Sequence, residues 1–111
     1  TSGGRANAEF IVDLTGTRRY FQAIVAAEDV PHGKPDPDVF VHTARLLGVP
    51  AERCLVIEDS EHGIEAARRA GMRCLALATT HPVDEIEGAN VVLEDMRAFS
   101  WKIWGSLFTD R

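Results

Sequence analysis

Two adjacent acids, Glu58 and Asp59, are the residues of this sequence best suited to carry chemistry. They directly follow the apolar run of residues 54–57 and precede Ser60, a residue type that commonly begins a helix. Hard cations such as Mg²⁺ favour carboxylate oxygens, and one or two carboxylates together with a substrate phosphate complete such a site. The pair is therefore predicted to bind Mg²⁺. The alternative is that both acids only stabilise the positive end of the following helix dipole.

Lys34 is the cation that fits a bound phosphate best. It lies between Gly33 and Pro35 on a loop that two prolines make rigid. A lysine held in place at the edge of a sheet can neutralise charge on a phosphoryl group. Considered alone, the same residue would be interpreted as a solvated loop lysine.

The first three residues, Thr1, Ser2 and Gly3, supply hydroxyl groups and backbone amides that could bind an anion. Only the fold can bring them to the acids, and a frayed chain end is the other interpretation. The four histidines show no spacing typical of a metal site.

Short apolar runs alternate with amphipathic segments, and these elements must position the polar residues. The pattern predicts an α/β protein with a parallel sheet, in which ligands bind beyond the carboxyl ends of the strands. At its centre, strands at residues 54–57 and 74–78 enclose a helix over residues 61–70, which Gly71 ends. The other expected elements are helices over residues 5–14, 37–47 and 96–108, a helical turn over residues 82–87, and strands over residues 22–26 and 91–93.

The helix over residues 37–47 has its own start signal. Asp36 is predicted to be the N-cap and Pro37 the first helical residue, where the fixed φ and missing N–H of proline are tolerated. Gly48 and Pro50 then end the helix.

Composition places the chain, residues 1–111, as one small domain with 45% hydrophobic residues. The net charge of -5 argues against nucleic acid and anionic membranes as partners. No apolar run approaches the ~20 residues of a transmembrane helix. Cys54 and Cys74 each begin or border a predicted strand, and we expect two reduced thiols in a cytoplasmic protein rather than a disulfide.

In this order, the motifs resemble those of the haloacid dehalogenase superfamily of phosphatases and phosphomutases, and most closely its β-phosphoglucomutase-like branch. The resemblance extends over about residues 1–92. Residues 1–5 resemble the second motif of the family, which binds the transferring phosphoryl group. Residues 33–38 resemble the third motif, whose lysine stabilises phosphoryl charge. Residues 58–60 with Gly63 resemble the fourth motif, whose acids hold Mg²⁺.

This resemblance implies a Rossmann-like parallel sheet flanked by helices and a Mg²⁺-dependent phosphatase or sugar phosphomutase acting on a small phosphorylated metabolite. The alternative is a catalytically silent α/β module that retains the phosphate and metal pocket. A flavodoxin-like receiver is a third interpretation, but its acids should follow the first strand. The site residues implied are Lys34 and Thr1 for catalysis, Thr1, Ser2, Gly3 and Lys34 for substrate binding, and Asp59 and Glu58 for the metal.

One departure concerns the nucleophile of the family, the first Asp of an Asp-x-Asp motif at the end of the first strand. The resemblance places that strand, and the cap domain that follows it, before Thr1. Asp36 and Asp38 have the right spacing but follow a Lys-Pro loop instead of an apolar strand. Asp13 lies in a segment with helical periodicity and is interpreted as part of a helix end. The chain alone is therefore expected to have no phosphatase activity.

The same departure affects the sheet, for which the resemblance implies the strand order five-four-one-two-three. Residues 23–26, 54–57 and 74–78 would be the third, fourth and fifth strands. Without the first strand, one edge of residues 54–57 exposes unpaired backbone groups, which is costly and favours pairing with another chain. We expect either that the strand around Ile24 shifts to pair with Val56, or that chains self-associate through the open edge.

Overall fold

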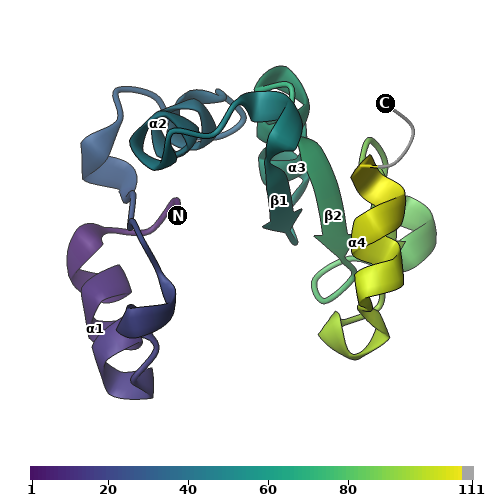
Figure 1. Ribbon diagram of the computed structural model, residues 1–111, viewed down its shortest axis with the longest axis horizontal. Coiled ribbons are helices and arrows are strands. Elements are labelled where there is room, and N and C mark those ends of the chain that lie inside the picture. The colour runs from purple at the N-terminus through teal and green to yellow at the C-terminus, as the bar shows by residue number, and fades with distance from the viewer. Residues whose placement is uncertain (109–111) are drawn as a thin grey trace.

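The computed structural model describes residues 1–108 and shows a three-stranded sheet with helices before, between and after its strands (Figure 1). None of the helices in that range is long and apolar enough to span a bilayer. The helices and strands are α1 (Arg5–Thr15), α2 (Asp38–Leu47), β1 (Leu55–Glu58), α3 (Glu61–Arg69), β2 (Arg73–Leu77), β3 (Val91–Leu93) and α4 (Trp101–Phe108).

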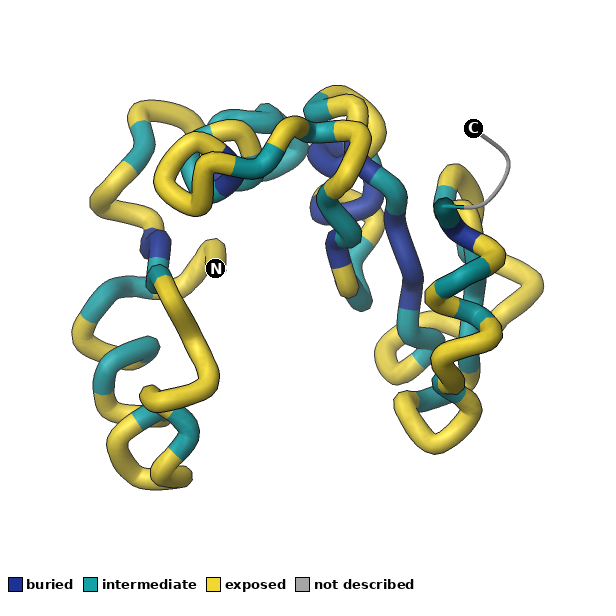
Figure 2. The backbone as a smooth tube through the Cα atoms, viewed as in Figure 1, coloured by how far each residue is buried: buried dark blue, intermediate teal, exposed yellow. Residues whose placement is uncertain are grey.

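The predicted α/β class with a parallel sheet is confirmed. The strands lie in the order β1-β2-β3, and both neighbouring pairs are parallel. The central strand β2 is the most buried, because Leu75 and Ala76 are fully enclosed. Figure 2 shows this buried strand with α3 beside it, and Ile64 and Ala67 of that helix join the same core. The core therefore lies on the β1–α3–β2 unit.

Local signals at both ends of α3 act as the sequence predicts. The Ser60 hydroxyl oxygen accepts a hydrogen bond from the Gly63 amide at 3.1 Å, which satisfies a free N–H of the first turn. After the helix, Gly71 takes a φ of 74°, the left-handed conformation that suits glycine. The flanking strands differ from the predicted bounds by a single residue at each end.

The predicted strand over residues 22–26 is wrong. Val25 and Ala26 are buried, but their segment pairs with no strand among the described residues. Its carbonyl groups have other partners: Arg5 Nη2 donates to the Ile24 oxygen at 3.1 Å and the Thr1 nitrogen to the Val25 oxygen at 2.8 Å. An extended segment forms a strand only when a neighbouring strand pairs with its backbone. Here the N-terminal residues bind its carbonyl groups instead.

The expected shift of this segment toward Val56 is also wrong. Figure 1 shows α1 and the segment after it apart from the sheet, with α2 between them. Within residues 1–108, β1 pairs only with β2, so its other edge is open. The sheet is thus the partial one that the sequence predicts, with no strand on that side.

The predictions for the two N-terminal helices agree with the structure to different degrees. Asp13 lies inside α1 as expected, but the apolar face of this helix is uncovered, with Phe10 62% and Leu14 72% exposed. Helix α2 begins at Asp38, one residue later than predicted. Asp36 Oδ1 nevertheless accepts the Asp38 amide at 3.1 Å, which is the contact expected of a capping side chain.

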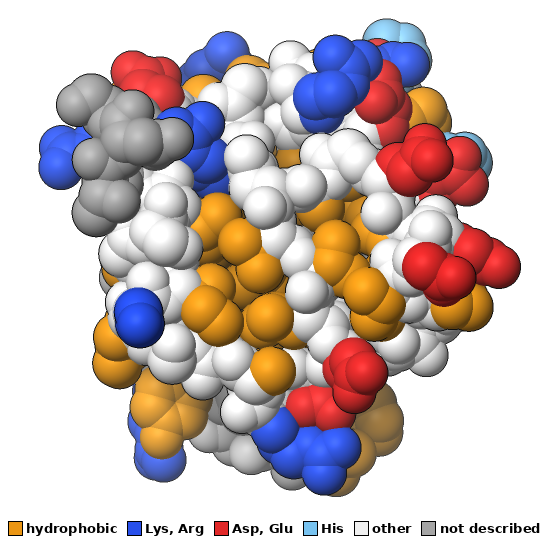
Figure 3. All heavy atoms as spheres, turned by 90° about the vertical axis from the view of Figure 1, so that its right-hand side faces the viewer, with side chains coloured by type: hydrophobic (Ala, Val, Ile, Leu, Met, Phe, Trp, Pro, Cys, Tyr) orange, Lys and Arg blue, Asp and Glu red, His pale blue; other side chains and the backbone are white. Residues whose placement is uncertain are grey.

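Of the helix predicted over residues 96–108, only the later part forms, as α4, and Met96–Ala98 is a separate helical turn. Rings of Trp101 and Trp104 meet edge to face with centroids 6.0 Å apart. Figure 3 views the side of the molecule that carries this helix and shows apolar side chains at its centre with charged ones around them. Cys54 and Cys74 are free thiols, as predicted, and burial raises the pKa of Cys74 to about 11.

Candidate active site

The carboxylate of Glu58, the last residue of β1, is the centre of the candidate site. Lys34 Nζ donates to its Oε2 at 2.7 Å, and the two side chains are only 13% and 9% exposed. The other oxygen, Oε1, accepts the Asp59 amide at 3.1 Å, the Ser60 amide at 3.3 Å and the Ser60 hydroxyl at 3.1 Å. Both carboxylate oxygens are therefore occupied by protein donors.

Gly63 provides the space for this carboxylate. A Cβ atom at position 63 would lie 2.0 Å from Glu58 Cδ, closer than any real contact. Residue 63 is buried in the first turn of α3, directly against the end of β1. The Glu58 side chain thus requires glycine at position 63. The motif of residues 58–60 with Gly63 did not reveal this role.

Opposing effects set the pKa of Glu58. Burial would raise it, but the hydrogen bond and positive charge of Lys34, with the donors around Asp59, outweigh burial and hold the pKa below its usual value of 4.5. Glu58 is therefore ionised at neutral pH. Its charge is matched by the ammonium group of Lys34, which also lies 5.2 Å from the centre of the Phe40 ring.

Three of the four residues predicted to bind phosphate share one cavity. Thr1, Ser2 and Lys34 line a space of about 240 Å³. Gly3 is not among its lining residues. Its amide donates to Thr1 Oγ1 at 3.1 Å, and its carbonyl accepts from Ala27 at 3.0 Å. The bond from Ala27, together with that from the Thr1 nitrogen to the Val25 oxygen, holds the N-terminal residues against the segment before Lys34.

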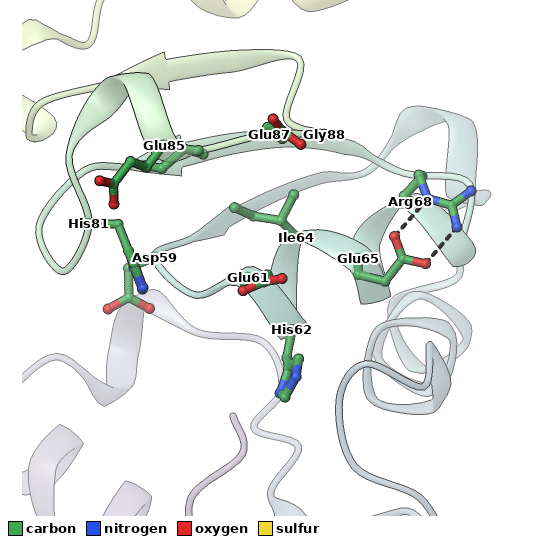
Figure 4. A pocket seen from close by; sticks show the side chains of 11 residues that line it. Asp59, Glu61, His62, Ile64, Glu65, Arg68, His81, Glu85, Glu87 and Gly88 are labelled. Carbon is green, nitrogen blue, oxygen red and sulfur yellow. Dashed lines mark hydrogen bonds and ion pairs between the residues drawn. The ribbon is translucent and has the colours of Figure 1, made fainter.

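Asp59 lies on a different cavity, of about 540 Å³, which it shares with His62, His81 and Glu85. Figure 4 shows Asp59, His81 and Glu85 at one side of this cavity. No cation of residues 1–108 forms an ion pair with the Asp59 carboxylate, in contrast to that of Glu58. Of the two predicted metal ligands, Asp59 is therefore the one whose oxygens suit a divalent cation.

The structure adds two residues that the sequence analysis missed. The Thr80 hydroxyl donates to the Asp59 carbonyl oxygen at 2.8 Å and lies 3.0 Å from His81 Nδ1. Both residues follow β2, whose carboxyl end lies at the same edge of the sheet as that of β1. A polar pair immediately after the second predicted strand was the signal that could have found them.

A second group of possible ligands lies near Lys34. Ligand atoms of His32, Asp36 and Asp38 lie within 4.8 Å of one another, although the spacing of the histidines indicated no such site. The loop itself accounts for this proximity, because Asp36 binds the Asp38 amide and His32 Nδ1 lies 3.1 Å from Asp38 Oδ2. The hydrogen bond with Asp36 and the contact with His32 lower the pKa of Asp38.

Comparison with known proteins places this chain in a family. The profile of haloacid dehalogenase-like hydrolases matches residues 1–71. The chain belongs to that family. A chloroplastic 5-amino-6-(5-phospho-D-ribitylamino)uracil phosphatase of Arabidopsis thaliana is 42% identical over 96 residues, which cover 86% of this chain and 26% of the relative.

Solved structures agree with the haloacid dehalogenase fold. A family IA, variant 3 hydrolase from Entamoeba histolytica superposes with a TM-score of 0.90 at 25% identity, over 99% of this chain and 52% of that one. A β-phosphoglucomutase from Clostridium difficile, at 24% identity, supports the fold alone, with a TM-score of 0.84 over 94% of this chain and 45% of that one. The chain thus spans between a quarter and a half of the length of these relatives.

Replacement of Gly63 by alanine tests the packing at Glu58. We expect Gly63→Ala to destabilise the chain by about 1–3 kcal/mol, because the new methyl group overlaps the Glu58 side chain. Urea unfolding measures the effect. Gly105→Ala is the control, since Gly105 in α4 faces open space and alanine favours a helix. Equal stability of Gly63→Ala and wild type would contradict the packing role.

The pH dependence of unfolding tests the Lys34–Glu58 pair. The folded pKa of Glu58 is lowered, so its contribution is present above about pH 4.5 and is lost as pH falls through the folded value. Glu58→Gln should flatten the decrease in melting temperature between about pH 5 and about pH 3. Calorimetric melting at low salt and at about 1 M NaCl measures this pH dependence. The contribution of the buried Glu58 pair should persist at high salt.

Glu65 is the control for that experiment. Its pKa is lowered to about 2 by Arg68 and Arg69, but the three side chains lie at the surface, so salt should suppress its contribution. A Glu58→Gln variant with the same pH dependence as wild type would show that the pair does not contribute to stability.

Proposed function

We propose that this chain is the phosphate- and magnesium-binding part of a phosphoryl-transfer enzyme, a phosphatase or sugar phosphomutase. The observation that supports this most is the Lys34–Glu58 pair, which lies next to Asp59 and beside the cavity of Thr1 and Ser2. Phosphoryl transfer depends largely on positioning and on neutralising charge, and both need cations fixed in place before the substrate arrives.

In this proposal Lys34 neutralises the phosphoryl oxygens of a substrate bound in that cavity. Thr1 and Ser2 bind the same group through hydroxyl and amide hydrogens, and Thr1 thereby assists catalysis. Glu58 holds the ammonium of Lys34 in one position, and the Phe40 ring adds a cation–π contact. Gly3 contributes indirectly, by holding Thr1 through its amide.

Asp59 is the proposed direct ligand of Mg²⁺, and Glu58 assists it. Glu58 Oε1 fixes the Asp59 amide, while its other oxygen is already bound to Lys34. When bound, Mg²⁺ would neutralise charge on the phosphoryl group as it transfers. The acid pair thus has divided roles, one residue toward the metal and the other toward the lysine.

The attacking carboxylate would come from outside the described residues. None of the carboxylates in residues 1–108 lines the cavity of Thr1 and Lys34, and Asp13 lies within α1. We therefore propose that this chain alone has no phosphatase activity. For the isolated chain, the same observation favours the alternative of a catalytically silent binding module.

The proposed substrate is a small phosphorylated metabolite. Support comes from the Arabidopsis relative, whose name describes a phosphatase for a phosphorylated ribitylaminouracil. An acidic chain with few converging cations is suited to a single phosphate group rather than to a nucleic acid.

A magnesium titration tests the proposed site. Amide chemical shifts of residues 58–61 should change saturably with Mg²⁺, and only at millimolar concentrations, because a single carboxylate is available. Asp59→Asn should abolish the change, whereas Asp84→Asn, an exposed acid in the Val83–Glu85 turn, should preserve it. A response that persists in Asp59→Asn would place the cation elsewhere.

We further propose that the isolated chain self-associates through the open edge of β1. An apolar groove of about 390 Å³ follows this edge, lined in part by Phe40, Leu47, Val56 and Ile57. Ile57 remains 49% exposed although it lies within a strand. A second copy of the chain could cover these side chains and pair with the free backbone groups.

Sedimentation velocity tests this association. Wild type should form dimers or larger species at micromolar concentration, and Ile57→Lys should shift the distribution toward monomer by placing a charge in the groove. Val83→Lys, a similar change at a 43% exposed residue outside the groove, should have no effect. A monomeric wild type across that concentration range would exclude the proposed interface.

A further inference from the structure

The backbone of Asp59 is held by side chains because it lies just beyond the sheet ladder. The last residue pair between β1 and β2 joins Glu58 to Ala76, so the carbonyl group of Asp59 has no strand partner. Thr80, in the loop after β2, donates its hydroxyl hydrogen to that carbonyl oxygen at 2.8 Å. The contact joins residues that are 21 positions apart in the sequence.

The amide of Asp59 is held from the opposite side. It donates to Glu58 Oε1 at 3.1 Å, and Lys34 and Gly63 fix the position of that carboxylate. With both backbone polar groups of Asp59 bound, its Cα–Cβ direction is determined. Asp59 lines the cavity shown in Figure 4, and no cation of residues 1–108 forms an ion pair with its carboxylate.

The direction of the Thr80 hydroxyl is also determined. A carbonyl oxygen can only accept, so the single hydroxyl hydrogen of Thr80 points to Asp59. Thr80 Oγ1 must then accept from His81 Nδ1, 3.0 Å away, and the His81 ring carries hydrogen on that nitrogen. His81 thus fixes Thr80, and Thr80 fixes Asp59.

We propose that Thr80 is a positioning residue for Asp59, with His81 orienting its hydroxyl group. This role rests on the proposed function of Asp59 as the metal ligand. Residues that orient a metal ligand commonly change metal affinity by 10- to 100-fold when they are replaced. Neither residue contacts the proposed phosphate cavity of Thr1 and Lys34, so their effect would pass only through Asp59.

Amide hydrogen exchange without metal tests the contact itself. Thr80→Val keeps the shape of the side chain but removes the hydroxyl group, and should accelerate exchange at Asp59 and Ser60 by about fivefold. Thr80→Ser restores the hydroxyl and should restore protection. Thr79→Val makes the same change one residue earlier and should leave both amides unchanged. Equal exchange in Thr80→Val and wild type would overturn the proposal.

A Mg²⁺ titration of the same four proteins tests the positioning role. Thr80→Val should weaken the affinity by about 10-fold, while Thr80→Ser and Thr79→Val should match wild type. An unchanged affinity in Thr80→Val, with accelerated exchange, would also overturn the positioning role. If wild type binds no Mg²⁺, the proposed metal site fails, whereas accelerated exchange in Thr80→Val would still support the Thr80 contact with Asp59.

Discussion

The ion pair between Lys34 and Glu58 is the contact on which the rest of the site depends. Both side chains are largely buried, and a buried charge is tolerated only when it is paired and hydrogen-bonded. Glu58 meets this condition with four donors to its two oxygens. Loss of either partner would leave an unpaired buried charge, which typically costs about 3–5 kcal/mol. The absence of a side chain at Gly63 follows from the same requirement.

The pair also connects the loop before α2 to the end of β1. Lys34 precedes α2 in the sequence, and Glu58 ends β1, the strand that follows that helix. Figure 1 shows α1 apart from the sheet, with the N-terminus on the side of α1 that faces β1. Because Thr1 and Ser2 share a cavity with Lys34, the pair also relates the N-terminal residues to the end of β1.

The sequence predicted elements whose signals are local and missed those that depend on a partner. The β1–α3–β2 unit follows from apolar runs, the Ser60 cap and Gly71, each of which acts within a few residues. The segment of residues 22–26 has the composition of a strand, but a strand also needs a neighbour, and composition cannot reveal which neighbour is present. The open edge of β1 was predicted from the resemblance, which implied the strand order five-four-one-two-three and a first strand outside this chain.

The same distinction applies to the candidate site. Residue type and position next to the predicted elements selected Lys34, Glu58 and Asp59, but did not reveal which of them pair with one another. The pairing of Lys34 with Glu58 joins residues 24 positions apart, and the contact of Thr80 with Asp59 joins residues 21 positions apart. Such contacts depend on strand register and loop path, neither of which leaves a pattern in the sequence.

The two adjacent acids at the end of β1 differ in what surrounds them. Glu58 faces Lys34 and the first turn of α3, where its charge is met by donors. Asp59 faces the other cavity, where no cation of residues 1–108 pairs with it. The proposed division of roles, with Glu58 organising the site and Asp59 binding the metal, rests on this difference in surroundings.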